Sequence, residues 1–389
     1  MSPAPHSPTG PRHVAGPVHQ MATRAVFLTA GTAMAVWAPL VPHAKTRLGV
    51  EDGAFGLLLL CLGLGSILAM PVTGVLTSRF GCRVVIVVAS SAMAIVLPFL
   101  VLADTMPELA IALAVFGASV GTVDVAINVQ AVMVENDSGR SMMSGFHGLF
   151  SLGGIVGAGG TSLLLGAGLA PLHATLIAAA LLITLLLSAF SGLLPYGNRD
   201  TGHTAHFAVP KGVVIVLGLL CFLVFLAEGA MLDWSALFMI AEHGSDAARA
   251  GFGYTAFAVA MTAGRLSGDR IVSRLGGRRI VIFGGGLAAG GFLLAVFAPD
   301  EIVGLVGFAL VGLGASNIVP VFFTAAGRQT RMPAGLAIAA ITTLGYAGIL
   351  LGPAMIGFVA QHWTLSTAFV LLAASMVFVA VLGPSAASE

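Results

Sequence analysis

Twelve apolar segments recur along the sequence, and they constrain the fold more than any other feature. Each is long enough to cross the hydrocarbon core of a bilayer as a helix, which takes about 20 residues. Charged residues, glycines or prolines bound the segments, which cover residues 23–42, 54–77, 84–103, 108–134, 143–168, 171–194, 212–240, 251–272, 280–299, 302–327, 335–360 and 365–383. The pattern therefore predicts an all-α membrane protein with twelve transmembrane helices.

The composition excludes the water-soluble classes of protein. Hydrophobic residues make up 58% of the 389 residues and charged residues only 8%, whereas soluble domains carry about 25% charged residues. The net charge of +1 gives no reason to expect a polyanionic partner such as nucleic acid. A soluble enzyme, a nucleic-acid binder, a disulfide-stapled secreted domain and a disordered chain are all excluded.

Metal, redox and nucleotide chemistry have no recognisable motif in the sequence. The three cysteines, Cys61, Cys82 and Cys221, show no CxxC spacing, and the ten histidines show no metal-ligand spacing. Residues Gly284 to Gly286 lie within an apolar segment and are not followed by the Lys-Ser/Thr pair of a phosphate-binding loop. We therefore expect no metal and no cofactor, and an energy source that is either an ion gradient or the gradient of the solute itself.

The longest polar break, residues 196–211, divides the chain into two halves. It predicts a cytoplasmic N-terminal tail at 1–21, six-helix bundles at 22–195 and 212–389, and a cytoplasmic linker between them. With the N-terminus inside, 13 of the 17 Lys and Arg residues fall on cytoplasmic loops and 3 on outside loops, while Arg265 lies within a span. Because positive charge marks the cytoplasmic side, we expect a bacterial inner-membrane protein with both termini in the cytoplasm.

An internal repeat relates the two halves. At a shift of 197 residues, Ala33 to Trp37 aligns with Ala230 to Trp234, and at a shift of 195, Arg79 to Arg83 aligns with Arg274 to Arg278. Chance similarity between apolar helices is the alternative explanation. A signal peptide at Ala25 to Val41 is disfavoured, because the segment recurs inside the chain. Parallel six-helix repeats are typical of secondary transporters, whose substrate site lies between the repeats near the membrane midplane.

The loop after the second span carries the longer motif Gly74-Val75-Leu76-Thr77-Ser78-Arg79-Phe80-Gly81-Cys82-Arg83. It resembles the loop between helices two and three of the major facilitator superfamily, whose pattern is roughly G-x-L-a-D-r-x-G-r-r, with Ser78 in place of the acid. The resemblance covers essentially the whole chain and implies a fold of two pseudo-symmetric six-helix bundles, in which this loop takes part in gating. The gating residues that it implies are Gly74, Arg79, Gly81 and Arg83 and, in the second copy, Asp269, Arg274, Gly276 and Arg278.

A narrower resemblance concerns the fucose-permease-like proton symporters of that superfamily. Asp124-Val125-Ala126-Ile127-Asn128 is similar to the acid-x-x-x-Asn motif of this branch, and Phe146 to Gly154 follows at a similar distance. The acid that the branch carries in its first helix is replaced here by Ala38. The resemblance implies proton-coupled transport of a sugar-like solute or another small metabolite.

Three acids lie well inside the predicted spans: Asp124, Glu228 and Asp233. A charge at the membrane centre costs about 2.5–3.5 kcal/mol on insertion scales, so each of these residues needs a reason to be there. A carboxyl group kept away from water can load and release a proton near neutral pH. We expect Asp124 and Glu228, which are near the midplane, to couple proton movement to transport, with Asp233 as a secondary candidate. The alternative is a buried acid held by a neighbouring amide or by an arginine such as Arg265.

Four further residues are expected to bind the substrate: Trp37, Asn128, Trp234 and Asn317. The tryptophans are related by the repeat, and indole rings bind sugar rings and cations. Asn128 shares a helix face with Asp124. Helix packing is the alternative for the tryptophans, and a helix–helix hydrogen bond is the alternative for Asn317. His147, at the start of the fifth span, either titrates near neutral pH as part of the site or bonds locally.

Together these features predict a secondary active transporter that moves a small polar organic solute by alternating access, driven by protons. Proton-antiport efflux of drugs or metabolites is the alternative within transport. A receptor or sensor that binds ligand without turnover is the alternative of another class. Because no nucleophile–base pair or metal cluster is visible, we do not expect an enzyme. The expected partners are the solute, protons and lipid, and we expect a monomer because only generic glycine pairs offer a dimer contact.

Overall fold

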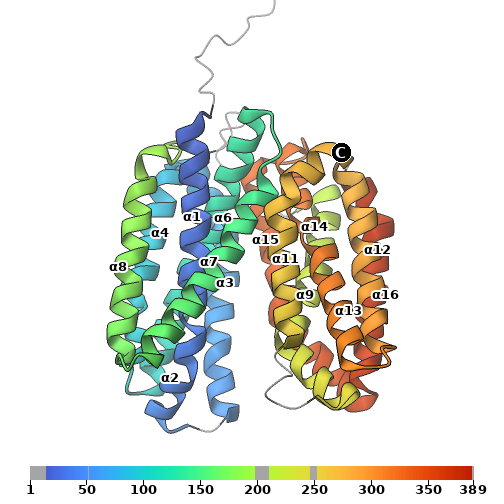
Figure 1. Ribbon diagram of the computed structural model, residues 1–389. Coiled ribbons are helices and arrows are strands. Elements are labelled where there is room, and N and C mark those ends of the chain that lie inside the picture. The colour runs from blue at the N-terminus through green and yellow to red at the C-terminus, as the bar shows by residue number, and fades with distance from the viewer. Residues whose placement is uncertain (1–14, 51, 198–209, 246–251, 388–389) are drawn as a thin grey trace, which may run out of the picture.

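The computed structural model of the protein describes residues 15–50, 52–197, 210–245 and 252–387, which fold almost entirely into helices (Figure 1). These ranges contain no strand. The helices, with η for a short 3-10 turn, are α1 (Pro17–Val36), η1 (Ala38–Leu40), α2 (Val41–Leu48), α3 (Asp52–Phe80), α4 (Cys82–Val96), α5 (Phe99–Leu102), α6 (Met106–Ser138), α7 (Met143–Gly166), α8 (Pro171–Ala189), η2 (Phe190–Gly192), α9 (Val213–His243), α11 (Phe252–Leu275), α12 (Gly277–Val296), α13 (Glu301–Ala315), α14 (Ile318–Arg328), α15 (Ala334–His362) and α16 (Leu365–Ala386).

Each predicted span corresponds to one helix or to two or three consecutive elements of this order. Eleven segments of the described chain are long and apolar enough to cross a membrane. The remaining predicted span, the eighth in order, is α11, which Arg265, Asp269 and Arg270 make more polar than the others. The first helix begins at Pro17, inside the predicted tail, and most of the predicted linker, 198–209, lies outside the described residues.

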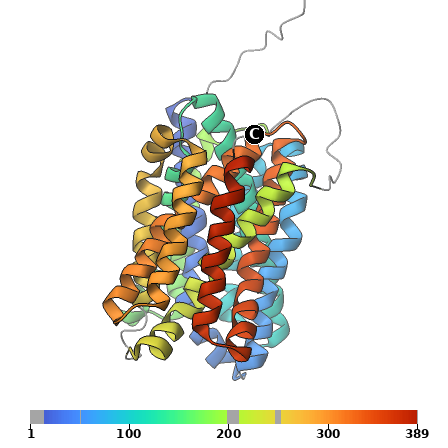
Figure 2. The ribbon, with the colours of Figure 1, turned by 90° about the vertical axis from the view of Figure 1, so that its right-hand side faces the viewer.

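The helices form two bundles that lie side by side (Figures 1 and 2). Helices α1 to α8 pack together in one bundle, and helices α9 to α16 pack together in the other. We call the side on which α1 begins and α16 ends the termini side, and the opposite side the distal side. The bundles meet through α3, α6 and α7 of the first and α11, α14 and α15 of the second. In Figure 1 the ribbons come together near the termini side and diverge toward the distal side.

The backbone repeats between the bundles at the loop that the sequence alignment singled out. Gly81 precedes α4 with φ +83° and ψ 158°, and Gly276 precedes α12 with φ +79° and ψ 152°. Glycine adopts a positive φ at little cost, whereas a side chain would strain it. Each glycine therefore ends one helix and begins the next with the same turn, in the 195-residue register of the sequence repeat.

The tenth span is broken into α13 and α14 at Ser316 and Asn317. Proline has no backbone N–H, so Pro320 cannot donate to the carbonyl four residues earlier, which is that of Ser316. The oxygen of Ser316 instead accepts a hydrogen bond from Nε of Arg265 at 3.3 Å. The break thus supplies a backbone acceptor that fixes the arginine of α11 inside the bundle.

Two adjacent glycines of α7 give a matched test of how closely α7 packs against α1. A Cβ added to Gly153 would collide with the backbone of α1 at Leu28 and Thr32, whereas one added to Gly154 would meet nothing within 4 Å. We expect Gly153→Ala to lower the free energy of unfolding by about 1–3 kcal/mol through overpacking. Gly154→Ala should be neutral or stabilising by up to about 1 kcal/mol, because alanine favours the helix. Thermal unfolding of the two variants in one detergent measures the difference, and equal effects would contradict it.

Candidate functional site

A polar cluster begins on α6 with Asp124, one of the two acids expected to couple protons. Asn128, one helical turn further, donates from Nδ2 to the backbone oxygen of Asp124 at 2.8 Å and to its Oδ1 at 3.5 Å. The amide oxygen of Asn128 lies 3.2 Å from Nε2 of His147 on α7, an arrangement in which the imidazole donates. Asn128 therefore ties an acid to a histidine within the first bundle.

Aromatic rings from both bundles enclose His147. Its ring centroid lies 5.4 Å from that of Phe27 on α1 and 5.6 Å from that of Phe323 on α14. Phe27 in turn stacks on Phe146 with a centroid distance of 5.6 Å. Because large rigid rings fill the space on two sides, the imidazole is held in one position at the junction of the bundles.

The second half of the cluster is an ion pair between Arg265 on α11 and Glu228 on α9, the other acid expected to couple protons. Nη2 of Arg265 lies 3.2 Å from Oε1 and 3.4 Å from Oε2 of Glu228. The two side chains are 8% and 17% exposed, respectively. Nη1 of the same guanidinium donates to Oγ of Ser151 on α7 at 3.0 Å. Arg265 thus links Glu228 to the opposite bundle.

These contacts form one hydrogen-bonded chain across the interface, from Asp124 to Glu228. Ser151 completes it by donating to the backbone oxygen of His147 at 3.2 Å. Within the described ranges, Glu228 has a cationic partner in Arg265, whereas Asp124 forms no ion pair. The charge of Glu228 is therefore compensated by the protein itself, while that of Asp124 is left to a proton or a cationic ligand.

Sequence reasoning missed Ser151 and two tyrosines beside the cluster. Tyr346 of α15 lies near enough to Asp124, and Tyr254 of α11 near enough to Glu228, for electrostatic interaction. A serine in an apolar helix carries no signal of its own. The chain has only three tyrosines, however, and this scarcity in an apolar sequence is the signal that could have drawn attention to them.

The predicted tryptophans lie away from this hydrogen-bonded chain. Trp37 follows α1 just before Pro39 and is 6% exposed. Trp234 lies in the distal half of α9, where its ring packs against Gly357 of α15. The indole Nε1 of Trp234 is buried without a hydrogen-bond partner. The indole N–H of Trp234 is therefore a donor that a ligand could use.

Asn317 and Asp233 also lie outside the hydrogen-bonded chain. Nδ2 of Asn317 donates to the backbone oxygen of Gly264 at 3.1 Å and to Oγ of Ser316 at 2.9 Å. This is a helix–helix hydrogen bond of the kind weighed as the alternative for Asn317, although its Oδ1 is buried without a partner. Asp233 is exposed in the distal half of α9.

Two carboxylates hold the N-terminus of α7 on the termini side. Asp269 of α11 accepts through Oδ1 a hydrogen bond from the backbone N–H of Gly145 at 3.0 Å, across the interface. Glu135 of α6 accepts through Oε2 from the N–H groups of residues 142–143 at 2.7 and 2.9 Å, and through Oε1 from Oγ1 of Thr324 on α14 at 2.6 Å. Negative charge stabilises a helix N-terminus. The bonds from Asp269 to Gly145 and from Glu135 to Thr324 also join the two bundles here. No sequence pattern pointed to Glu135 or Thr324.

The first copy of the gating motif binds within its own bundle. Arg83 donates from Nε to the backbone oxygen of Leu193 at 2.9 Å and from Nη2 to that of Ser191 at 3.2 Å. The guanidinium of Arg79 lies over the ring of Phe80 at 5.2 Å. With Ser78 in place of an acid, these arginines use backbone carbonyls and a ring instead of a carboxylate.

The two copies of the motif close the interface by different contacts. Gly74 of α3 packs against the backbone of Gly335 at the start of α15. Its counterpart in the 195-residue register is Asp269, which binds Gly145 at the start of α7. The first copy thus brings two backbones into close contact across the interface, whereas the second copy forms a hydrogen bond through a carboxylate. The remaining residues of the second copy are exposed: Arg274, Gly276 and Arg278.

Known proteins share this architecture. The family model of the Major Facilitator Superfamily matches residues 217–386. An uncharacterised MFS-type transporter of Yersinia pestis is 55% identical over 361 residues, which cover 93% of this chain and 94% of the relative. An uncharacterised transporter of Sinorhizobium fredii is 34% identical over 367 residues, covering 92% and 95% of the two chains. The chain belongs to the major facilitator superfamily.

The fold of this superfamily member is shared with a solved structure, that of the fucose:proton symporter of E. coli. The TM-score is 0.80, and the match covers 94% of this chain and 97% of the symporter at 16% identity. The predicted family and the predicted all-α fold of two bundles are confirmed, together with the distant similarity to fucose-permease-like symporters. The protein is thus a multi-pass membrane transporter for small molecules, and it belongs to a family whose members are not enzymes.

Proposed function

We propose that the protein takes up a small polar organic solute across the bacterial inner membrane by proton-coupled alternating access. The termini side is then cytoplasmic, which agrees with the excess of Lys and Arg on the loops of that side. The bundles at 22–195 and 212–389 are the two moving units of a monomer. With this orientation, the contacts of Asp269 and Glu135 between the bundles close the side of the transporter that faces the cytoplasm.

One observation carries this proposal, namely that the hydrogen-bonded chain from Asp124 to Glu228 runs between the bundles. Ionisable groups within a membrane are retained where they face a partner or a substrate path, because facing lipid is costly. A chain whose central link, Arg265 to Ser151, crosses the interface must break when the bundles separate. When the transporter changes state, the polar groups of this cluster therefore exchange their partners in the opposite bundle for the solute.

In this mechanism Asp124 carries the proton. It has no ion pair among the residues that the structure describes, so a proton is the partner that neutralises it during the transition. Arg265 keeps Glu228 as a partner while its Nη1 is released from Ser151 and becomes free to bind a solute hydroxyl or carboxyl group. Trp234, with its unpartnered indole N–H, supplies a further donor toward the distal side.

Reconstitution of the full chain in liposomes tests the proposed function. A thermal-shift screen of sugars, polyols, amino acids and organic acids at two pH values first identifies a stabilising solute. Its uptake is then measured with and without an inward proton gradient, and we expect accumulation only with the gradient. Export against an imposed gradient would favour efflux. Binding without counterflow would favour a receptor and contradict transport.

The closure on the termini side predicts the effect of Asp269→Asn. Asparagine can still accept the N–H of Gly145 but removes a charge at the N-terminus of α7 that contributes up to about 2 kcal/mol. The fraction of molecules open on this side should therefore rise by up to about thirtyfold. Alkylation of a Ser144→Cys variant, in a background without the native cysteines, measures this opening because Ser144 is buried in the closed state.

Asp300→Asn is the matched control for this prediction. Asp300 caps α13 on the distal side, where its Oδ1 accepts the N–H of Val303 at 3.0 Å. The substitution removes the same charge from a helix N-terminus but does not touch the interface. Equal acceleration of alkylation in the two variants would mean that general loosening, and not the closure, controls access.

A further inference from the structure

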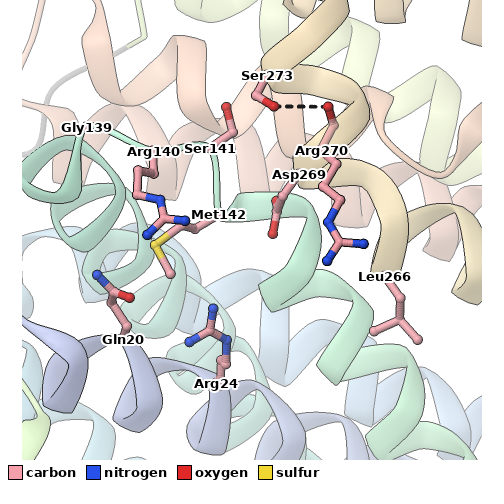
Figure 3. Close-up of a pocket in the computed structure, with 10 residues that line it drawn as sticks. All are labelled: Gln20, Arg24, Gly139, Arg140, Ser141, Met142, Leu266, Asp269, Arg270 and Ser273. Atoms are coloured by element: carbon pink, nitrogen blue, oxygen red, sulfur yellow. Dashed lines mark hydrogen bonds between the residues drawn. The ribbon is translucent and has the colours of Figure 1, made fainter.

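A hollow on the termini side lies apart from the polar cluster and is lined by both bundles (Figure 3). Its volume is about 700 Å³. The first bundle contributes α1 and the connection between α6 and α7, with Gln20, Arg24 and Arg140 on the wall. The second bundle contributes α11, with Asp269 and Arg270. The hollow is therefore complete only while the bundles meet on this side.

The charge of the hollow is unbalanced. Three arginines line it, one on each of its three elements: Arg24, Arg140 and Arg270. The carboxylate among its lining residues, Asp269, already accepts the backbone N–H of Gly145. The ion pairs formed within the described chain lie elsewhere. Asp269 is near enough to Arg24 to interact with it electrostatically, but it is one carboxylate among three arginines. The lining thus carries more positive than negative charge.

Arg24 is held toward the hollow by the aromatic core of its bundle. Its guanidinium carbon lies 5.9 Å from the ring centroid of Phe146. Phe146 is fully buried and stacks on Phe27. A guanidinium held over a ring keeps its N–H edge free for hydrogen bonding, and a fixed donor loses less conformational freedom on binding.

We propose that this hollow binds a phosphate-bearing anion, and that the bound anion stabilises the conformation closed on the termini side. Guanidinium groups match the oxygens of a phosphate in geometry and charge. The volume is within the range of about 300–1,000 Å³ typical of small-ligand sites. Because Arg24 and Arg140 belong to one bundle and Arg270 to the other, an anion that touches all three favours the state in which they converge.

The phosphate has two possible sources, which separate arms of one experiment distinguish. In the first arm, inorganic phosphate is added to the purified full chain in neutral detergent, with chloride at equal ionic strength as the reference. In the second arm, the chain is placed in nanodiscs of phosphatidylcholine with or without phosphatidylglycerol. Thermal unfolding is measured in both arms, and the phosphate affinity is taken from the concentration dependence of Tm.

The site variants are Arg24→Gln, Arg140→Gln and Arg270→Gln, and the control is Arg279→Gln. Arg279 is exposed at the start of α12 and does not line the hollow. Each site variant removes a charged donor and should weaken the affinity for phosphate about tenfold, while the control should leave it unchanged. A site variant that matches the unsubstituted chain in Tm without phosphate is folded, so its loss of response reports on the site.

If inorganic phosphate stabilises the chain and the site variants lose this stabilisation, the hollow binds a soluble phosphate compound. Stabilisation by phosphatidylglycerol alone, lost in the same variants, assigns it to a lipid headgroup. In either case the ligand should slow alkylation of Ser144→Cys, because it favours the closed state. No stabilisation in either arm, or stabilisation that Arg279→Gln loses equally, would overturn the proposal.

Discussion

Proton-driven accumulation of the solute should be lost in Asp124→Asn, while exchange of solute across the membrane continues. With one proton per solute, an inward gradient of one pH unit supports about tenfold accumulation, and the variant should fall to no accumulation. The physical reason is that Asp124 forms no ion pair within the described chain, so its charge is the one that a proton must neutralise. Asparagine cannot carry that proton, but it keeps the size and polarity of the side chain. Uptake and counterflow in the same liposomes measure the two activities.

Glu242→Gln is the control for this result. Glu242 is exposed near the distal end of α9, away from the polar cluster, and its replacement should leave the accumulation ratio unchanged. Accumulation that persists in Asp124→Asn would remove Asp124 from the coupling mechanism. Loss of both accumulation and counterflow would assign Asp124 to solute binding instead.

Arg265→Gln should lower the free energy of unfolding by about 3 kcal/mol, the cost of leaving a buried carboxylate without its partner. Glu228 is 17% exposed and receives its charged hydrogen bonds from Arg265. The double variant Arg265→Gln/Glu228→Gln should recover most of the loss, because it leaves no unpaired charge. Thermal or denaturant unfolding of the single and double variants measures the coupling between the two residues.

The exposed ion pair of Arg47 and Asp104 supplies the control. Its shortest N···O distance is 2.7 Å, but its side chains are 43% and 72% exposed. Surface pairs contribute about 0–1 kcal/mol, so Arg47→Gln should cost far less than Arg265→Gln. A double variant at residues 228 and 265 that is as unstable as the single one would contradict compensation within the pair.

Sequence periodicity predicted some parts of the site because they depend on spacing within one helix. Asp124 and Asn128 are one turn apart on α6, and the structure joins them by the hydrogen bond that this spacing permits. The positions of Gly81 and Gly276 followed from the repeat, and both have the positive φ that the helix-to-helix turn requires. Such local features need no knowledge of how helices are arranged.

Other parts could not be predicted because they depend on how distant helices meet. Arg265 was weighed in the sequence only as a possible partner of an acid. Its partners Glu228, Ser151 and Ser316 come from α9, from α7 and from the break between α13 and α14. Trp37 was predicted to bind substrate from its relation to Trp234, and the structure places it where α1 gives way to a short turn before Pro39. Helix packing, and not spacing along the chain, decides these placements.

Access to Ser151 tests most directly whether the polar cluster is reached from both sides of the membrane. Ser151→Cys, in a background without the native cysteines, is treated with a membrane-impermeant maleimide in right-side-out and in inside-out vesicles. The mechanism predicts modification from both sides, slowed by the transported solute, because the residue lies where the two bundles separate and meet in turn. Modification by a lipid-soluble maleimide alone, or from one side alone, would contradict alternating access at this site.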